Sequence, residues 1–297
     1  MPSARPLKIT GHAMPELPEV ETVVRGLRPL LEGRTFARVR SYAPPASIIV
    51  STSLRRGGLE RLLPGRTVES ITRRGKNILI ALSGDITLWI HLKMTGKLLA
   101  LPSLTPRDKH DLVLFDLESD GSHSAADHLR FNDYRRFGRL RLFPNHELWQ
   151  QDGLRELGPE PLEVSAADFV ALCHTRTRMI KPALLDQSFI AGIGNIYADE
   201  SLYLSRIHPT RLTSTVSKTK LQDLHRHIQA VLRRSIKMMG TTVISYAGVD
   251  GASGSFQRML RVYGREGEPC GVCGAKIVRM KMGARSAHFC PRCQRAR

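Results

Sequence analysis

The sequence is short of acidic residues. Its 297 residues include 27 Asp and Glu against 45 Lys and Arg, which gives a formal net charge of +18 at pH 7. A surface this basic attracts polyanions, of which nucleic acid is the first candidate and an anionic membrane the second. The charge therefore favours a phosphate-rich partner.

Long hydrophobic runs are also absent. No stretch approaches the roughly 18 apolar residues of a membrane-spanning helix, and residues 1–13, MPSARPLKITGHA, lack the apolar centre of a secretory signal. Hydrophobic residue types nevertheless make up 41% of the chain, enough for one large or two ordinary domains. We expect a soluble, cytoplasmic protein that does not bind membranes.

Cysteine is scarce, and its placement is specific. Four of the five cysteines form two Cys-x-x-Cys pairs near the C-terminus: Cys270, Cys273, Cys290 and Cys293. In a reducing compartment this pattern favours a metal over disulfides, and four thiolates leave no open coordination position. The pattern predicts one structural zinc ion, with redox pairs or free thiols as the alternative. Cys173, in the apolar stretch AADFVALCH, is expected to pack in a core.

The pattern of apolar residues changes along the chain. Apolar residues at helical spacing predict a helix over residues 17–33. Residues 34–144 alternate in short runs, and in DITLWIHLKM the alternation places Met94 on the same face as Ile86. This favours an antiparallel sandwich or barrel. Helical spacing returns after Pro144, including a long helix from Ser217 to Met239. The fold class predicted is α+β.

The stretch AMPELPEVETVVRG holds a proline directly after a second methionine. A proline inside a chain is an inert tertiary amide, but removal of Met14 would leave Pro15 as a secondary amine and hence a nucleophile. Glu16 follows it at once. Carboxylates there also suit the positive start of a helix, so both explanations stand for Glu16 and Glu19.

Five motifs carry a resemblance to a known family. MPELPEVE, HLKMTGKL, FNDYRRFG, GIGNIYADES and the four-cysteine tail together resemble bacterial formamidopyrimidine-DNA glycosylase, from Met14 to about Gln294. The resemblance implies an extension at 1–14 that is absent from the active protein, a catalytic β-sandwich at 15–147, a helix-two-turn-helix domain at 148–259 and a zinc finger at 260–297. It also implies a monomer with double-stranded DNA in the cleft between the two halves, and association with the nucleoid.

The resemblance implies a bifunctional enzyme that excises oxidised purines and then cuts the strand. By this resemblance Pro15 attacks the sugar C1′, Glu16 is the general acid/base and Glu19 orients the amine or the helix start. Lys76 matches a lysine that assists β-elimination, and Arg285 one that clamps phosphate and assists δ-elimination. The alternative explanations are an ordinary hairpin-turn lysine for Lys76 and a solvated basic surface for Arg285.

The resemblance also assigns DNA contacts. Phosphate or base contacts fall on His110, Arg135, Arg176 and Asn195. A base inside a duplex must be flipped out for chemistry, and the void is filled by the side chains that match Met94, Arg135 and Phe137. The competing explanations are a structural histidine for His110, a helix cap for Asn195 and core packing for Met94.

Two departures and two rival functions remain open at this stage. Residues 1–13 would acylate Pro15 if they were retained, and Ile244 stands where some relatives have a basic residue. One rival is an endonuclease-VIII-like glycosylase for oxidised pyrimidines, although Leu17 follows the purine enzymes. The other is a zinc-stabilised DNA-binding protein without chemistry.

Overall fold

The computed structural model describes residues 14–44, 47–54, 57–102, 105–118, 127–175, 177–241 and 254–296. Contacts divide them into two compact units. One unit falls within His12–Arg155 and Met239–Ser255, and the other comprises Glu156–Met238 and Phe256–Arg297. Ile244 and the extension before Met14 lie outside the described residues. Of the predicted loop over 247–255, only the last two residues are described.

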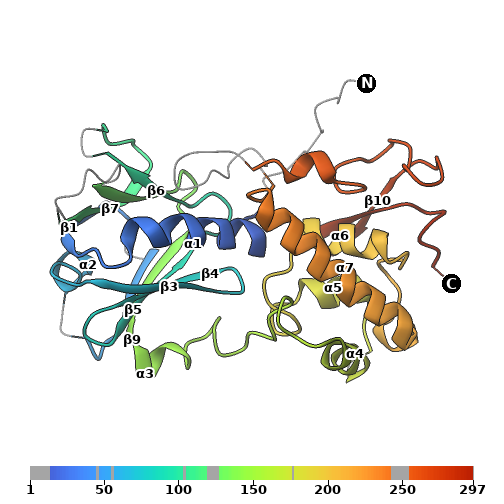
Figure 1. Cartoon of the computed structure of the whole chain (residues 1–297), viewed down its shortest axis with the longest axis horizontal. Helices are drawn as coiled ribbons and strands as arrows, with labels where there is room; N and C mark the ends of the chain where they lie inside the picture. Colours follow the sequence, from blue (N-terminus) through green and yellow to red (C-terminus); the bar gives the residue numbers. More distant parts are fainter. Residues whose placement is uncertain are drawn as a thin grey trace. The chain divides into compact units, whose positions relative to one another are not determined.

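The first unit contains two sheets and one long helix, α1 (Leu17–Leu31). One sheet has the order β1-β7-β8-β6 and is antiparallel throughout. Its strands are β1 (Phe36–Ser41), β7 (Asp111–Leu117), β8 (His128–Asn132) and β6 (Lys97–Leu101). The helix α1 runs beside the strands (Figure 1).

The second sheet has the order β2-β9-β5-β4-β3. Its strands are β2 (Ile48–Val50), β9 (Arg139–Pro144), β5 (Ile86–His91), β4 (Asn77–Leu82) and β3 (Val68–Arg74). Neighbours are antiparallel except β2 and β9, which pair in parallel. Two short helices, α2 (Leu59–Leu62) and α3 (Asn145–Leu148), complete the unit.

One hydrophobic core joins α1 to both sheets. Val20, Val23 and Leu27 of α1 pack in the same cluster as Phe36 of β1 and Leu88 of β5. Burial of each such side chain contributes about 1.5–3 kcal/mol relative to exposure. Polar contacts fix the far end of α1, since Arg28 Nε donates to the Ile71 carbonyl at 2.8 Å and Glu32 Oε1 accepts from Ile71 N at 2.8 Å. The first catalytic residues expected from the sequence, Pro15 and Glu16, therefore directly precede a firmly anchored helix.

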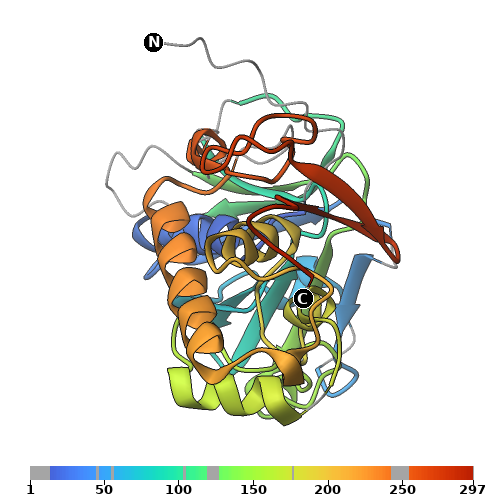
Figure 2. The same ribbon diagram turned by 90° about the vertical axis from the view of Figure 1, so that its right-hand side faces the viewer.

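The second unit is helical and ends in a hairpin. Its helices are α4 (Ala166–Thr175), α5 (Ile180–Leu185), α6 (Asn195–Leu204), η2 (Thr213–Thr215), α7 (Lys218–Lys237) and η3 (Phe256–Met259), followed by β10 (Val278–Met282) and β11 (Arg285–Phe289). Within this unit α6 contacts both α7 and β11 (Figure 2). The predicted α+β fold with a sheet domain, a helical part and a β-hairpin is confirmed, and Cys173 is buried as expected.

Two sequence expectations, for Met94 and for the long C-terminal helix, need adjustment. The strand β5 ends at His91, so Met94 lies in the following turn and does not continue the apolar face of Ile86. The other face of β5 is buried too, because Trp89 packs inside as fully as Ile90. The long C-terminal helix begins at Lys218, with the Ser217 side chain accepting from Lys220 N as its cap. No described helix is long and apolar enough to cross a membrane.

Glu200 joins α6 to the segment that leads into the zinc hairpin. Its carboxylate accepts three backbone N–H bonds, from Arg261 at 2.8 Å and from Val262 and Tyr263 at 2.9 Å each. The side chain is buried, with 3% of its surface exposed. The three donors would lose their only common acceptor if this carboxylate were changed.

We predict that Glu200→Gln lowers the free energy of unfolding by about 1–3 kcal/mol, because an amide nitrogen cannot accept an N–H bond and a buried donor is left unsatisfied. Urea denaturation measures the change. The matched control is Glu266→Gln, which alters an exposed glutamate of the same segment. Equal stability of the two variants would contradict the prediction.

Candidate functional site

Pro15 and Glu16 directly precede α1 and are both buried. Glu16 is the N-cap residue and forms a reciprocal capping box with Glu19: the Glu16 backbone N–H donates to Glu19 Oε2 at 3.0 Å. The second oxygen of Glu19 accepts from Thr241 N at 2.7 Å. Glu19 thus holds the residue next to Pro15 and fixes the chain just after Gly240.

Gly240 has a positive φ of 80°, a conformation that glycine adopts without strain. A Cβ at this position would lie 2.9 Å from Glu19 Oε1. The glycine therefore allows the backbone to approach the carboxylate closely. Both oxygens of Glu19 are occupied by backbone donors, which favours the helix-start explanation over direct chemistry for this residue.

Lys76 lies in the tight turn between β3 and β4, beside Gly75 with its φ of 58°. Arg73 fixes this turn to α1, since its Nε donates to Glu21 Oε2 at 3.0 Å and its Nη1 to the Gly75 carbonyl at 3.0 Å. Burial alone would raise the pKa of Glu21, but hydrogen bonds and charges from Arg25 and Arg73 hold that pKa below its ordinary value. The Lys76 turn and the start of α1 are thereby parts of one rigid frame.

His91, at the end of β5, shapes the next loop. Its Nδ1 accepts from Lys93 N at 2.9 Å, and Lys93 has a φ of 53°. Burial, followed by the positive charges of Lys93, Lys76 and Arg141, lowers the pKa of His91 to about 3. A neutral ring is required, because a protonated Nδ1 could not accept the Lys93 N–H.

Asp133 connects the two loops that carry the expected void-filling residues. Its carboxylate accepts from Arg135 N at 3.1 Å, from Gly138 N at 2.7 Å and from the Thr95 hydroxyl of the Met94 loop. Asp133 is fully buried. The spacing of Met94 from the 133–138 loop is therefore set by one carboxylate.

The expected void-filling side chains are not core residues. Phe137 is 46% exposed, and the Arg135 guanidinium lies over its ring, 4.7 Å from the centroid. Met94 is half-buried in a turn. His110 lies near the same loop, with its ring edge-on to Tyr134 at 6.2 Å and its carbonyl accepting from Asp133 N. The structure thus brings His110, Met94, Arg135 and Phe137 to adjoining loops.

In the second unit, Asn195 is the first residue of α6 and not its cap. Gly194 is the N-cap, without a side-chain cap bond, and Asn195 Oδ1 is buried without a hydrogen-bond partner among the described residues. The cap explanation for Asn195 is therefore wrong. The positive end of the helix dipole at this position suits an anion. Arg176 lies outside the described residues.

Arg285 opens β11 at the exposed tip of the hairpin, after Gly283 in a left-handed turn. A buried ion pair anchors this strand: Lys181 Nζ donates to Asp199 Oδ1 at 2.5 Å and to the Ser286 carbonyl at 2.6 Å. Asp199 Oδ2 also accepts from His288 N at 2.9 Å. The backbone on the C-terminal side of Arg285 is thereby tied to α5 and α6.

The four paired cysteines have the geometry of a tetrahedral metal site. Their ligand atoms all lie within 4.8 Å of one another. The Sγ atoms are 3.9 Å apart for Cys270 and Cys293, 3.4 Å for Cys273 and Cys290, and 3.5 Å for Cys273 and Cys293. Zinc–thiolate bonds of about 2.3 Å place sulfurs about 3.8 Å apart in a tetrahedron, so the residues fit a structural zinc ion.

Comparisons with known proteins define the class. Three family descriptions match in order: "Formamidopyrimidine-DNA glycosylase N-terminal domain" over residues 14–140, "Formamidopyrimidine-DNA glycosylase H2TH domain" over 157–246 and "Zinc finger found in FPG and IleRS" over 267–296. They place the chain among DNA glycosylases with a zinc finger.

Curated relatives agree over nearly the whole chain. The formamidopyrimidine-DNA glycosylase of Lactiplantibacillus plantarum is 42% identical over 95% of this chain and 100% of its own length, and that of Pediococcus pentosaceus is 43% identical over 95% and 99%. The Lactococcus lactis enzyme in complex with abasic-site DNA superposes with a TM-score of 0.83 at 34% identity, covering 94% of this chain and 99% of that one. The chain belongs to the formamidopyrimidine-DNA glycosylase family.

Sequence reasoning missed the residues that hold the site together. Asp133, His91, Lys181 and Asp199 bear none of the roles expected from the motifs, yet each fixes a segment that carries a proposed functional residue. Asp133 offered one signal, because an Asp two residues before Arg135 and ahead of a glycine is typical of a side-chain-capped turn. The long-range pair of Lys181 and Asp199 left no local pattern.

We predict that Asp133→Asn lowers the free energy of unfolding by about 1–3 kcal/mol and speeds amide exchange at Arg135 and Gly138, because the amide provides one acceptor oxygen where two are used. Hydrogen exchange and urea denaturation provide the two measurements. Asp152→Asn, at a carboxylate with 86% of its side chain exposed, is the control. Protection of the 133–138 loop unchanged in both variants would refute the assignment.

The His91 ring also predicts a pH dependence. Since its folded pKa of about 3 lies below the unfolded value near 6.5, the unfolded chain gains a proton first as pH falls, and stability declines from about pH 6.5 towards pH 3. Over that pH range the free energy of unfolding should fall less steeply in His91→Gln than in the parent protein. The difference in slope should be up to about 1.4 kcal/mol per pH unit. Chemical denaturation at pH 6, 5 and 4 measures the slope, and exposed His146→Gln should leave it as in the parent protein.

Proposed function

We propose that the protein is a bifunctional DNA glycosylase and AP lyase of base excision repair that removes oxidised purines from duplex DNA. The observation that carries the proposal is the family match from residue 14 to residue 296, with Pro15 and Glu16 set at the buried, capped start of α1. The bacterial relatives and the resulting DNA binding support a location with the nucleoid in the cytoplasm.

The reaction follows from a free amine at Pro15. An α-amino group has a pKa of about 7.7–8.0, so part of it is neutral near pH 7 and can attack the sugar C1′. The new N–C1′ bond forms as the bond from C1′ to the base breaks, and the leaving base takes up the proton that the amine nitrogen loses. Glu16 donates a proton to the ring oxygen, which opens the sugar and leaves an iminium ion at C1′.

Strand cleavage uses the acidity that the iminium confers on C2′. Loss of a C2′ proton expels the 3′ phosphate, and a second elimination expels the 5′ phosphate. Lys76, in a turn fixed by Arg73, assists the first step, and Arg285 at the hairpin tip holds phosphate in the second. Both eliminations leave the amine bound until water releases the sugar fragment.

Binding is divided among the remaining residues. The positive start of α6 and the Asn195 amide receive a backbone phosphate, as do His110 and Arg176. Met94, Arg135 and Phe137 occupy the void left by the flipped nucleotide, where apolar and aromatic insertion offsets an unstacking cost of a few kcal/mol. The zinc ion supplies rigidity to the hairpin and takes no part in bond making.

The proposal assigns the chain a catalytic β-sandwich at 15–147, a helix-two-turn-helix domain at 148–259 and a zinc finger at 260–297. It also requires removal of residues 1–14 from the active protein. An acylated Pro15 has no lone pair available for attack, so the leader and the lyase activity exclude one another.

We predict that borohydride traps a covalent adduct between protein that begins at Pro15 and duplexes that contain 8-oxoguanine or an abasic site. Intact mass of the protein establishes the free N-terminus, and denaturing electrophoresis measures the adduct. The matched control is the chain with Pro15 acetylated, which should bind the same duplex and give no adduct.

The outcomes separate the alternatives. Binding without an adduct in the unblocked protein indicates an architectural DNA-binding protein. Preferential trapping on oxidised pyrimidines indicates the endonuclease-VIII-like specificity. Undiminished strand cleavage by the acetylated chain would refute Pro15 as the nucleophile.

A further inference from the structure

Two adjoining hollows lie at the C-terminal end of α6 in the second unit. Their volumes are about 210 Å³ and 440 Å³, and both are lined by Arg206, Lys220 and Arg295. Arg211 adds a further cation to the first hollow and Arg292 to the second. These five residues define what is here called the basic trough.

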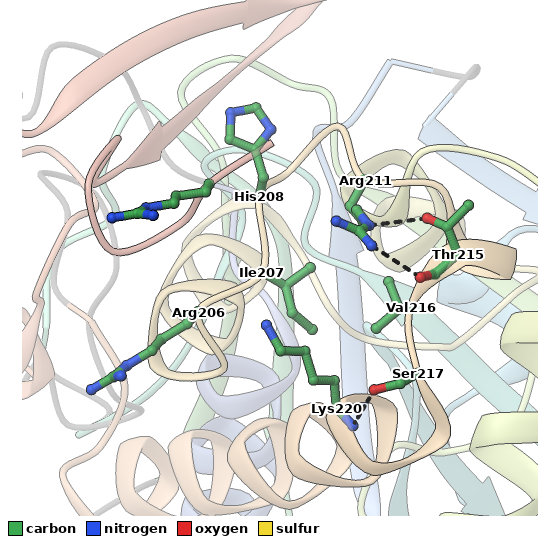
Figure 3. A pocket seen from close by; sticks show the side chains of 9 residues that line it. Arg206, Ile207, His208, Arg211, Thr215, Val216, Ser217 and Lys220 are labelled. Atoms are coloured by element: carbon green, nitrogen blue, oxygen red, sulfur yellow. Dashed lines mark hydrogen bonds between the residues drawn. The ribbon is translucent and has the colours of Figure 1, made fainter. Parts of the chain in front are cut away.

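The first hollow has no acidic residue in its lining, and Ile207 and Val216 are buried in its wall. The second hollow also borders Cys273 and Cys293, two of the thiolate ligands of the zinc site. Arg211 donates to the hydroxyl and carbonyl of Thr215 at 3.0 and 3.2 Å, as Figure 3 shows, and these partners carry no charge. Among the described residues no carboxylate forms an ion pair with any cation of the trough, so in the first hollow the repulsion between the cations has no acidic partner to offset it.

The start of α7 adds positive potential to the same place. Ser217 caps this twenty-residue helix, and its first turn holds no acidic residue. Lys218 and Lys220 stand there, although a helix start favours negative charge. Figure 3 shows Lys220 reaching from α7 towards Ile207, with Arg211 across the hollow. An anion in the trough would meet both the side chains and the helix start.

The trough lies at the other end of α6 from Asn195, one of the proposed DNA contacts. Arg206 is eleven residues after Asn195, and the ten-residue helix between them is about 15 Å long. We propose that the basic trough is a second phosphate-binding site, which takes a multiply charged phosphate group outside the lesion-binding surface. Its span over two hollows suits linked phosphates, whether in a free polyphosphate or nucleotide or in a nucleic-acid backbone.

The test uses zinc-loaded protein and two probes, inorganic pyrophosphate and an undamaged single-stranded oligonucleotide, with binding measured by calorimetry. The trough variant is Arg206→Gln with Lys220→Gln. The control is Arg233→Gln with Lys237→Gln, which removes the same charge from exposed positions near the other end of α7. Thermal unfolding establishes that both variants are folded, and Arg295→Gln is a second trough variant.

Pyrophosphate should bind the parent protein and the control alike and the trough variant at least about tenfold more weakly, since each charged hydrogen bond lost is of the order of a factor of ten. If pyrophosphate binds the trough variants more weakly than the control, the ligand is a free phosphate compound. If only the oligonucleotide does so, the ligand is a nucleic-acid backbone. If neither probe distinguishes the trough variants from the control, the site does not exist. That outcome leaves the Pro15 chemistry untouched, because no trough residue takes part in it.

Discussion

The structure depends on buried carboxylates that accept backbone N–H bonds from segments far apart in sequence. A buried charge costs several kcal/mol unless its lone pairs are satisfied, so each such group admits essentially one arrangement of its donors. Glu19 and Asp133 serve the first unit in this way, and Asp199 and Glu200 the second. All four side chains are at most 3% exposed. The loops are therefore ordered by hydrogen bonds to buried carboxylates as well as by apolar packing.

This constraint fixes the backbone beside residues that are proposed to be functional. Glu16 is held by Glu19, Arg135 by Asp133, and Arg285 adjoins the Ser286 carbonyl that Lys181 and Asp199 retain. Arg285 is exposed and Arg135 partly exposed while the backbone beside them is fixed, whereas the Glu16 side chain is itself buried. Catalytic groups need such preorganisation, since a misplacement of about 1 Å is costly to rate. The carboxylates act by position and need not touch the substrate.

Sequence patterns predicted what is local and missed what is long-range. Apolar spacing located α1 and α7, and the spacing of Cys270 and Cys293 in their pairs located the metal site. The same reasoning placed Met94 on a strand face, because alternation alone does not show that a left-handed Lys93 ends the strand. Asp199 looked like one more polar residue of a helix, since nothing nearby in the chain signals a partner at Lys181 or His288. Side chains that become partners only through folding produce no periodic pattern in the sequence.

The helix α6 shows how one element can organise a whole unit. From Ile196 to Tyr203 all its side chains are buried, which is unusual for a helix that carries two carboxylates. Asp199 holds β11, Glu200 holds residues 261–263, and the Tyr203 hydroxyl lies 3.2 Å from Cys270 Sγ. A hairpin as small as β10–β11 has too small a hydrophobic core to be stable alone. The zinc ion and these three contacts together provide the missing stabilisation. The orientation of the hairpin tip is consequently set at α6, the same helix that begins with Asn195.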